Sequence, residues 1–130
     1  MKVVEVVAAV IENNGEIFCA QRNDNKLDYL AYKYEFPGGK VEVGETQEEA
    51  LLREIKEELN YAISIDRFLL TVDHQYPDFR LIMHAYACTA GDRDYKLNEH
   101  AKGVWLKDAE LPTLDWAAAD VPIVNYIVHK

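Results

Sequence analysis

The sequence lacks much of the chemistry on which several common enzyme classes depend. Its single serine, Ser64, lies between isoleucines with no glycine-flanked turn, which excludes a serine hydrolase. The two cysteines, Cys19 and Cys88, show no metal-binding spacing and indicate buried thiols in a reducing compartment. The apolar run from Val3 to Ile11 is too short to cross a bilayer and has no signal-peptide cleavage site. We therefore expect a cytoplasmic protein.

Positive charge is also scarce. The 130 residues include 14 Lys and Arg against 23 Asp and Glu, so the formal net charge is −9 at pH 7. A surface this acidic disfavours binding to a nucleic-acid polymer or an anionic membrane, and we expect neither as a partner. A small polyphosphate remains open as a substrate, provided that a divalent cation mediates the contact. The length suits one domain, and we expect residues 1–130 to form it.

Apolar periodicity and turn signals predict strands interleaved with two helices. The predicted strands span residues 3–11, 16–22, 62–72, 80–89 and 103–106, and the predicted helices span 46–60 and 117–129. Asn13-Asn14-Gly15 predicts a turn, so the first two strands should form a hairpin. We expect Pro37-Gly38-Gly39 to interrupt regular structure, and residues 108–111 to form one helical turn. This order indicates an α+β fold with a mixed β-sheet between helices.

The first helix carries the clearest local signals. Thr46 and Glu49 match a capping box at its start, and Asn60 suits the left-handed residue that ends a helix. Four leucine and isoleucine side chains follow at helical spacing and should form its core face: Leu51, Leu52, Ile55 and Leu59.

An acidic sector borders that apolar face. Glu54, Glu57 and Glu58 share it, and the like-charged pair Glu54 and Glu58 destabilises a helix by roughly 0.2–0.5 kcal/mol. A solvated acidic surface is the plain interpretation of such a run. However, carboxylates at the rim of a core can also line a cleft, where their oxygens suit a hard cation such as Mg²⁺. A bound metal ion could then activate water beside a phosphate.

The helix and the loop before it resemble the Nudix box, G-x(5)-E-x(7)-REU-x-EE-x-GU, in which U is a bulky apolar residue. The match spans residues 39–61 and includes every charged position of the motif, together with one glycine and one apolar residue: Gly39, Glu45, Arg53, Glu54, Ile55, Glu57 and Glu58. Two positions depart, because Asn60 replaces the final glycine and Tyr61 replaces an aliphatic residue. Asn60 can adopt the same left-handed backbone.

The resemblance implies an α/β/α sandwich and an enzyme that hydrolyses a nucleoside diphosphate linked to another group, with Mg²⁺ or Mn²⁺. It also implies roles for individual residues. The metal ligands would be Glu54, Glu57 and Glu58, with the backbone carbonyl of Gly38 beside them. Arg53 and Glu45 would form an ion pair that orients the loop against the helix.

Residues 34–40 are similar to the segment before the box in MutT-like Nudix enzymes, which convert nucleoside triphosphates to the monophosphate and pyrophosphate. In that group a glutamate before a tryptophan-containing strand contributes to the metal site, and Glu99 stands six residues before Trp105. Glu99 is thus a candidate metal ligand or general base, against the plain alternative of a solvated loop glutamate. Arg22 is a candidate phosphate ligand or a plain surface cation.

The remaining substrate-binding candidates are Gly39, Phe79 and Asp120. A glycine pair lets the backbone approach phosphate, and Phe79 could stack on a base or belong to the core. The position of Asp120 reads the base in MutT-like enzymes. If ionised, Asp120 only accepts hydrogen bonds, which suits the exocyclic amine of cytosine but also the ring N–H and amine of guanine. Its plain alternative is a carboxylate favoured at a helix N-terminus.

The whole chain resembles the CTP pyrophosphohydrolase branch of MutT-like proteins, which also accepts modified dCTP, and the 8-oxo-dGTP diphosphatase branch is its neighbour. Either branch implies sanitation of the nucleotide pool. An ADP-ribose pyrophosphatase is an alternative because Pro77 lies sixteen residues past the box, although Tyr76-Pro77-Asp78 is also an ordinary turn. A non-catalytic nucleotide-sensing Nudix module is the alternative from another class. It is disfavoured because every box glutamate is present. Nudix proteins are often dimers, so a homodimer is possible.

Overall fold

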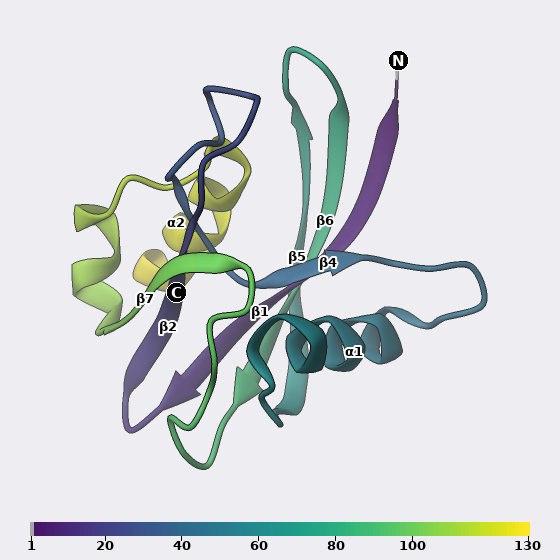
Figure 1. The fold of residues 1–130 in the computed structure, drawn as a ribbon. Coiled ribbons are helices and arrows are strands. Elements are labelled where there is room, and N and C mark those ends of the chain that lie inside the picture. The colour runs from purple at the N-terminus through teal and green to yellow at the C-terminus, as the bar shows by residue number, and fades with distance from the viewer. Residues whose placement is uncertain (1) are drawn as a thin grey trace.

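The computed structural model describes residues 2–130 and shows one mixed sheet with a helix on each face (Figure 1). The strands are β1 (Val3–Asn13), β2 (Glu16–Arg22), β3 (Tyr34–Glu35), β4 (Gly38–Lys40), β5 (Ser64–Gln75), β6 (Arg80–Thr89) and β7 (His100–Leu106). The helices are α1 (Gln47–Leu59) and α2 (Val121–His129), with 3₁₀ turns η1 (Asp108–Thr113) and η2 (Ala118–Asp120). The sheet order is β3-β2-β1-β6-β5, with β4 beside β1 and β7 beside β2.

The central strand β1 separates the two cores. It runs parallel to β6 and antiparallel to β2 and β4. Its side chains alternate, so that Val7 and Ile11 pack with α1, whereas Ala8 and Val10 pack with α2. Both faces of β1 are therefore covered, and the mixed sheet between helices agrees with the predicted α+β class.

Local signals set both ends of α1 as predicted. Thr46 Oγ1 accepts from Glu49 N at 3.1 Å, and Glu49 Oε1 accepts from Thr46 N at 2.9 Å. Asn60 ends the helix in the left-handed conformation with φ 48° and ψ 43°. The prediction for Leu52 was wrong, because its side chain is 44% exposed. It lies at the edge of the apolar sector, on a part of the helix surface that is exposed to solvent.

The expected break at Pro37-Gly38-Gly39 was also wrong. Residues 38–40 form β4, which pairs with β1 through Ala8 opposite Gly38 and Val7 opposite Gly39. A Cβ on Gly38 would lie 1.8 Å from Val7 O, so only glycine allows this close pairing. The glycines thus permit a strand that carries the start of the box directly to the centre of the sheet.

The C-terminal half differs from prediction mainly at element ends. β7 begins at His100 instead of residue 103, and a 3₁₀ turn at Ala118–Asp120 precedes α2. Pro122 lies in the first turn of α2, where its missing N–H is harmless. Cys19 and Cys88 are buried and free, as expected, and burial raises the pKa of each thiol to about 12. Within residues 2–130, no helix has the length and apolarity needed to cross a membrane.

Candidate active site

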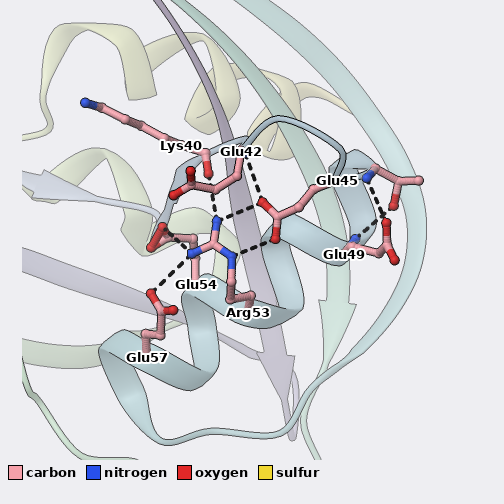
Figure 2. Close-up of polar contacts among 8 residues, drawn as sticks. Lys40, Glu42, Glu45, Glu49, Arg53, Glu54 and Glu57 are labelled. Carbon is pink, nitrogen blue, oxygen red and sulfur yellow. Dashed lines mark hydrogen bonds and ion pairs between the residues drawn. The ribbon is translucent and has the colours of Figure 1, made fainter.

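Arg53 fixes the box loop to α1. Its Nε donates to Glu45 Oε2 at 2.7 Å and its Nη2 donates to Glu45 Oε1 at 2.9 Å and to Lys40 O at 3.0 Å (Figure 2). Glu45 Oε1 also accepts from Glu42 N at 2.9 Å, so the carboxylate holds both ends of the loop's turn. The hydrogen bonds from Arg53, followed by the one from Glu42 N, lower the pKa of Glu45.

The same guanidinium also contacts the acidic row of α1, which consists of Glu54, Glu57 and Glu58. Arg53 Nη1 donates to Glu57 Oε2 at 3.2 Å and to Glu54 Oε2 at 3.3 Å (Figure 2). The planar fork therefore connects the loop carboxylate with two carboxylates of the helix, a geometry that a lysine ammonium does not reproduce. Arg53 is suited to orient these groups.

Replacing Arg53 by lysine tests this role. We expect R53K to lower the free energy of unfolding by about 1–2 kcal/mol, because charge-assisted bonds to Glu45 and Lys40 O are lost. We also expect at least about a tenfold loss in kcat, since Glu54 and Glu57 lose their shared donor. Urea unfolding and steady-state kinetics measure both, with K56A as an exposed control on the same helix. Wild-type values for R53K would show that a positive charge at this position suffices without the geometry of the guanidinium.

The carboxylate of Glu54 lies directly against Gly39. A Cβ on Gly39 would lie 2.3 Å from Glu54 Cδ, so the absent side chain makes room for the carboxylate. Burial is the largest cause of the raised pKa of Glu54. The charge of Arg53 lowers this pKa, and the charge of Glu57 raises it. The close approach brings the Glu54 carboxylate beside β4, whose residues Gly38 and Gly39 line the cleft.

Glu58 is the most unusual carboxyl of the site. It is only 6% exposed, and its Oε2 has no hydrogen-bond partner among residues 2–130. Burial, followed by repulsion from Glu35, Glu54 and Glu99, raises the pKa of Glu58 to about 9. A bound cation would stabilise an unpartnered carboxylate oxygen that is surrounded by other carboxylates.

The donor set fits a divalent metal ion, although the side chains do not form a finished cage. Among residues 2–130, no three Asp, Glu, His or Cys side chains are already arranged to hold an ion. Arg53 instead occupies one oxygen each of Glu54 and Glu57. The unpartnered oxygen of Glu58 and the surrounding carboxylates are hard oxygen donors, which Mg²⁺ and Mn²⁺ prefer.

Glu99 approaches this row from another segment. It lies just before β7, lines the same cleft as Glu58, and its charge raises the pKa values of Glu54 and Glu58. Its backbone carbonyl accepts from Asn23 Nδ2 at 2.7 Å. The structure thus brings together carboxylates from α1 and from a loop forty residues later, whereas Glu57 points toward solvent with 58% of its side chain exposed.

An ion cluster that the sequence analysis missed lies beside them. Arg22 Nη1 donates to Glu35 Oε1 at 2.8 Å, and His100 Nε2 lies 2.9 Å from Glu35 Oε2. Burial favours the neutral form of Glu35, but His100 and Arg22 outweigh it and lower its pKa. The plain-surface alternative for Arg22 was wrong, since this residue is paired and lines the cleft. The available signals were Glu35 in the segment before the box and His100 beside Glu99.

Asp120 also lines the cleft, is 4% exposed, and its Oδ1 accepts from Phe36 N at 3.0 Å. Burial, followed by the charge of Glu35, raises the pKa of Asp120 well above its usual range. Burial therefore favours the protonated carboxyl, which can donate as well as accept, whereas the argument for cytosine used the ionised, acceptor-only form. Asp120 is the N-cap residue of α2 but makes no side-chain capping bond, so its position still agrees with the alternative of a carboxylate at a helix N-terminus.

One cleft of about 750 Å³ joins these groups, a volume typical of a small-molecule site. Its lining includes the carboxyl groups of Glu58, Glu99 and Asp120. Other residues that line it are Arg22, Gly39, Phe36, Tyr76, Phe79 and Met83. Trp116 instead packs against Phe36 with ring centroids 4.6 Å apart and is 8% exposed. The cleft lining therefore combines charged and aromatic side chains.

The NUDIX domain family matches residues 6–126. The chain belongs to the Nudix family. The CTP pyrophosphohydrolase of Escherichia coli K12 is 34% identical over 125 residues, which cover 96% of this chain and 91% of that protein. The 8-oxo-dGTP diphosphatase of the same organism is 29% identical over 125 residues, which cover 95% of each chain. This Nudix chain is a hydrolase of the MutT-like group.

A solved Nudix structure supports the same placement. The solution structure of a DNA mismatch repair protein MutT from methicillin-resistant Staphylococcus aureus 252, a Nudix hydrolase, is 39% identical. It superposes with a TM-score of 0.76 and covers 98% of both chains. Nudix hydrolases generally need a divalent metal, which agrees with the oxygen donors of this site.

Proposed function

We propose that this Nudix hydrolase is a Mg²⁺-dependent nucleoside triphosphate pyrophosphohydrolase, with Mn²⁺ as a substitute metal, that releases the nucleoside monophosphate and pyrophosphate. Its preferred substrates are CTP, dCTP or modified dCTP. The observation that carries this proposal is a cleft whose lining combines the carboxyl groups of Glu58, Glu99 and Asp120 with Arg22 and the aromatic ring of Phe79. A cleft of this size has room for a metal-bound phosphate chain and a base.

Different residues would bind the metal, transfer a proton and orient the ligands. Glu54, Glu57, Glu58 and Glu99 would hold the metal, with the Gly38 carbonyl beside them. Bound Mg²⁺ would offset charge on the phosphates and lower the pKa of a coordinated water. Glu99 would serve as a ligand or as the base that removes a proton from the attacking water. Arg53 would keep the carboxylates of Glu54 and Glu57 in place.

At the phosphate chain, Arg22 offers a guanidinium that Glu35 already orients at 2.8 Å. Its Nε is buried and has no partner among residues 2–130, which leaves a donor available for an anionic oxygen. Gly39 permits close approach of the β4 backbone.

At the base, Phe79 supplies a ring for stacking and Asp120 supplies polar recognition. In its protonated form, which burial favours, Asp120 can donate to a ring nitrogen and accept from an amine, and cytosine offers these side by side. Guanine also offers donors and acceptors, so the preference for cytosine is supported chiefly by the 34% identical CTP pyrophosphohydrolase. An 8-oxo-dGTP diphosphatase is the second candidate, supported by the 29% identical relative.

The other two alternatives have weaker support. Pro77 lies in the tight turn between β5 and β6, where Tyr76 N donates to Phe79 O at 2.8 Å, so its presence has a local structural reason. This removes the main argument for an ADP-ribose pyrophosphatase. A nucleotide sensor without catalysis would not need the buried, mutually repelling carboxylates of Glu54 and Glu58.

Product analysis on a substrate panel tests the proposal. With Mg²⁺, we expect CMP or dCMP and pyrophosphate from CTP, dCTP and 5-methyl-dCTP at the highest kcat/KM, and no turnover in excess EDTA. The panel also contains 8-oxo-dGTP, dGTP and ADP-ribose.

Each other outcome has a distinct meaning. A preference for 8-oxo-dGTP would retain the pyrophosphohydrolase and replace the base assignment. Cleavage of ADP-ribose alone would contradict the triphosphate assignment, and no turnover of any compound would revive the nucleotide-sensing module.

A further inference from the structure

The loop between β6 and β7 is fastened to the C-terminal end of α1. Lys96 N donates to Leu59 O at 2.8 Å, and Asn98 N donates to Glu58 O at 3.1 Å. The Asn98 side chain adds a third bond, because its Nδ2 donates to Glu57 O at 2.9 Å. These donors satisfy three of the carbonyls that a helix end leaves without intrahelical partners.

Asn98 has a second side-chain partner at the position where this chain departs from the Nudix box. Its Nδ2 also donates to Asn60 Oδ1 at 2.9 Å. The box has glycine at this position, and glycine would adopt the same left-handed backbone without an acceptor. The exchange of glycine for Asn60 therefore adds a contact to the loop and preserves the end of the helix.

The residue held next in the chain is Glu99. The preceding residue Asn98 is bonded to α1. Asn23, which follows the end of β2, donates from its Nδ2 to the Glu99 carbonyl at 2.7 Å. The side chain of Glu99 is exposed, and on its other side His100 pairs with Arg22 at the start of β7. Asn98 is therefore the contact that ties the Glu99 backbone to α1.

We propose that Asn98 is a positioning residue that places Glu99 against the carboxylates of α1, and that Asn60 is its side-chain partner. The proposal deepens the proposed function, on which it rests for the role of Glu99 in metal binding or proton transfer. A merely structural role would be different: Asn98 would stabilise the end of α1, and its loss would change thermal stability without changing metal affinity or turnover.

The test combines N98A with E99Q in a double-mutant cycle. The readouts are the Mn²⁺ dissociation constant by calorimetry without nucleotide, kcat and KM for the best substrate of the panel, and the thermal midpoint. We expect N98A to weaken Mn²⁺ binding and lower kcat about tenfold each, with a smaller change in KM. In the E99Q background, N98A should change neither quantity by more than about twofold.

Two further variants keep the test decisive if N98A folds poorly. N60G removes only the Asn60 acceptor and should lower kcat about two- to threefold, with no effect in the N98A background. K96A retains the main-chain bond of Lys96 to Leu59 and serves as the matched loop control, with wild-type values expected.

The proposal is overturned if N98A lowers only the thermal midpoint, or if its full effect persists in E99Q. It is equally overturned if E99Q matches wild type in both Mn²⁺ affinity and kcat. Absence of triphosphate hydrolysis by the wild type would be a failure of the proposed function alone, because the Mn²⁺ affinities would still decide whether Asn98 acts through Glu99.

Discussion

Replacing Glu57 by glutamine is expected to lower kcat by about two to three orders of magnitude and to leave the fold intact. The side chain of Glu57 is 58% exposed, and its hydrogen bond to a side chain is the 3.2 Å contact with Arg53 Nη1. An exposed pair at this helical spacing contributes only about 0.3–0.5 kcal/mol to stability. Glutamine keeps the shape and removes the charge, so a loss of turnover would be due to a missing metal ligand.

Steady-state kinetics across a range of Mg²⁺ concentrations, with thermal unfolding of the same samples, measures this expectation. E48Q is the matched control, because Glu48 is an exposed glutamate in the first turn of α1, away from the acidic row. E48Q should behave like wild type. Full activity in E57Q would remove Glu57 from the metal site, and a large drop in its thermal midpoint would show that the residue has a structural role instead.

Replacing Glu58 by glutamine is expected to have opposite effects on stability and activity. The pKa of Glu58 is about 9 in the folded, metal-free protein, against 4.5 for an ordinary glutamate. Between these values the folded state binds more protons than the unfolded state, so the stability of the wild type falls as pH rises, by at most about 1.36 kcal/mol per pH unit from this group. E58Q removes this group and should flatten the dependence.

Urea unfolding in EDTA at pH 6, 7.5 and 9 tests the sign of this pH dependence of stability. We expect E58Q to be more stable than wild type at pH 9, with a difference that narrows toward pH 6. With Mn²⁺ added, the wild type should be stabilised and E58Q much less so, because binding to the native state requires the carboxylate. Turnover of E58Q should fall by orders of magnitude. Wild-type stability that does not fall with pH in EDTA would contradict the raised pKa.

How much the sequence predicts depends on how local each feature is. The ends of α1 follow from neighbours in sequence, since Thr46 meets Glu49 three residues later and Asn60 needs only its own backbone conformation. The spacing of the box likewise fixes which carboxylates lie on one side of α1. These features were predictable because no distant segment is needed to form them.

The features that were missed depend on distant contacts. Strand β4 has three residues and exists only because it pairs with β1, so its own composition predicts a break instead. Glu35 and His100 meet across 65 residues. The raised pKa of Asp120 results chiefly from its burial beside segments distant in sequence, such as Phe36, 84 residues away, and sequence spacing carries no information on that burial.

The place of β1 in the sheet also constrains how the chain is made. β1 is synthesised first, yet its parallel partner β6 begins at residue 80, 67 positions after β1 ends at residue 13. At about 5–20 residues per second, a ribosome needs roughly 3–13 seconds to cover that distance. During this interval β2 and β4 can pair only with the other side of β1, so the apolar edge that β6 will occupy stays open in the nascent chain. Soluble yield will then depend on translation speed and chaperone access, independently of the stability of the finished fold.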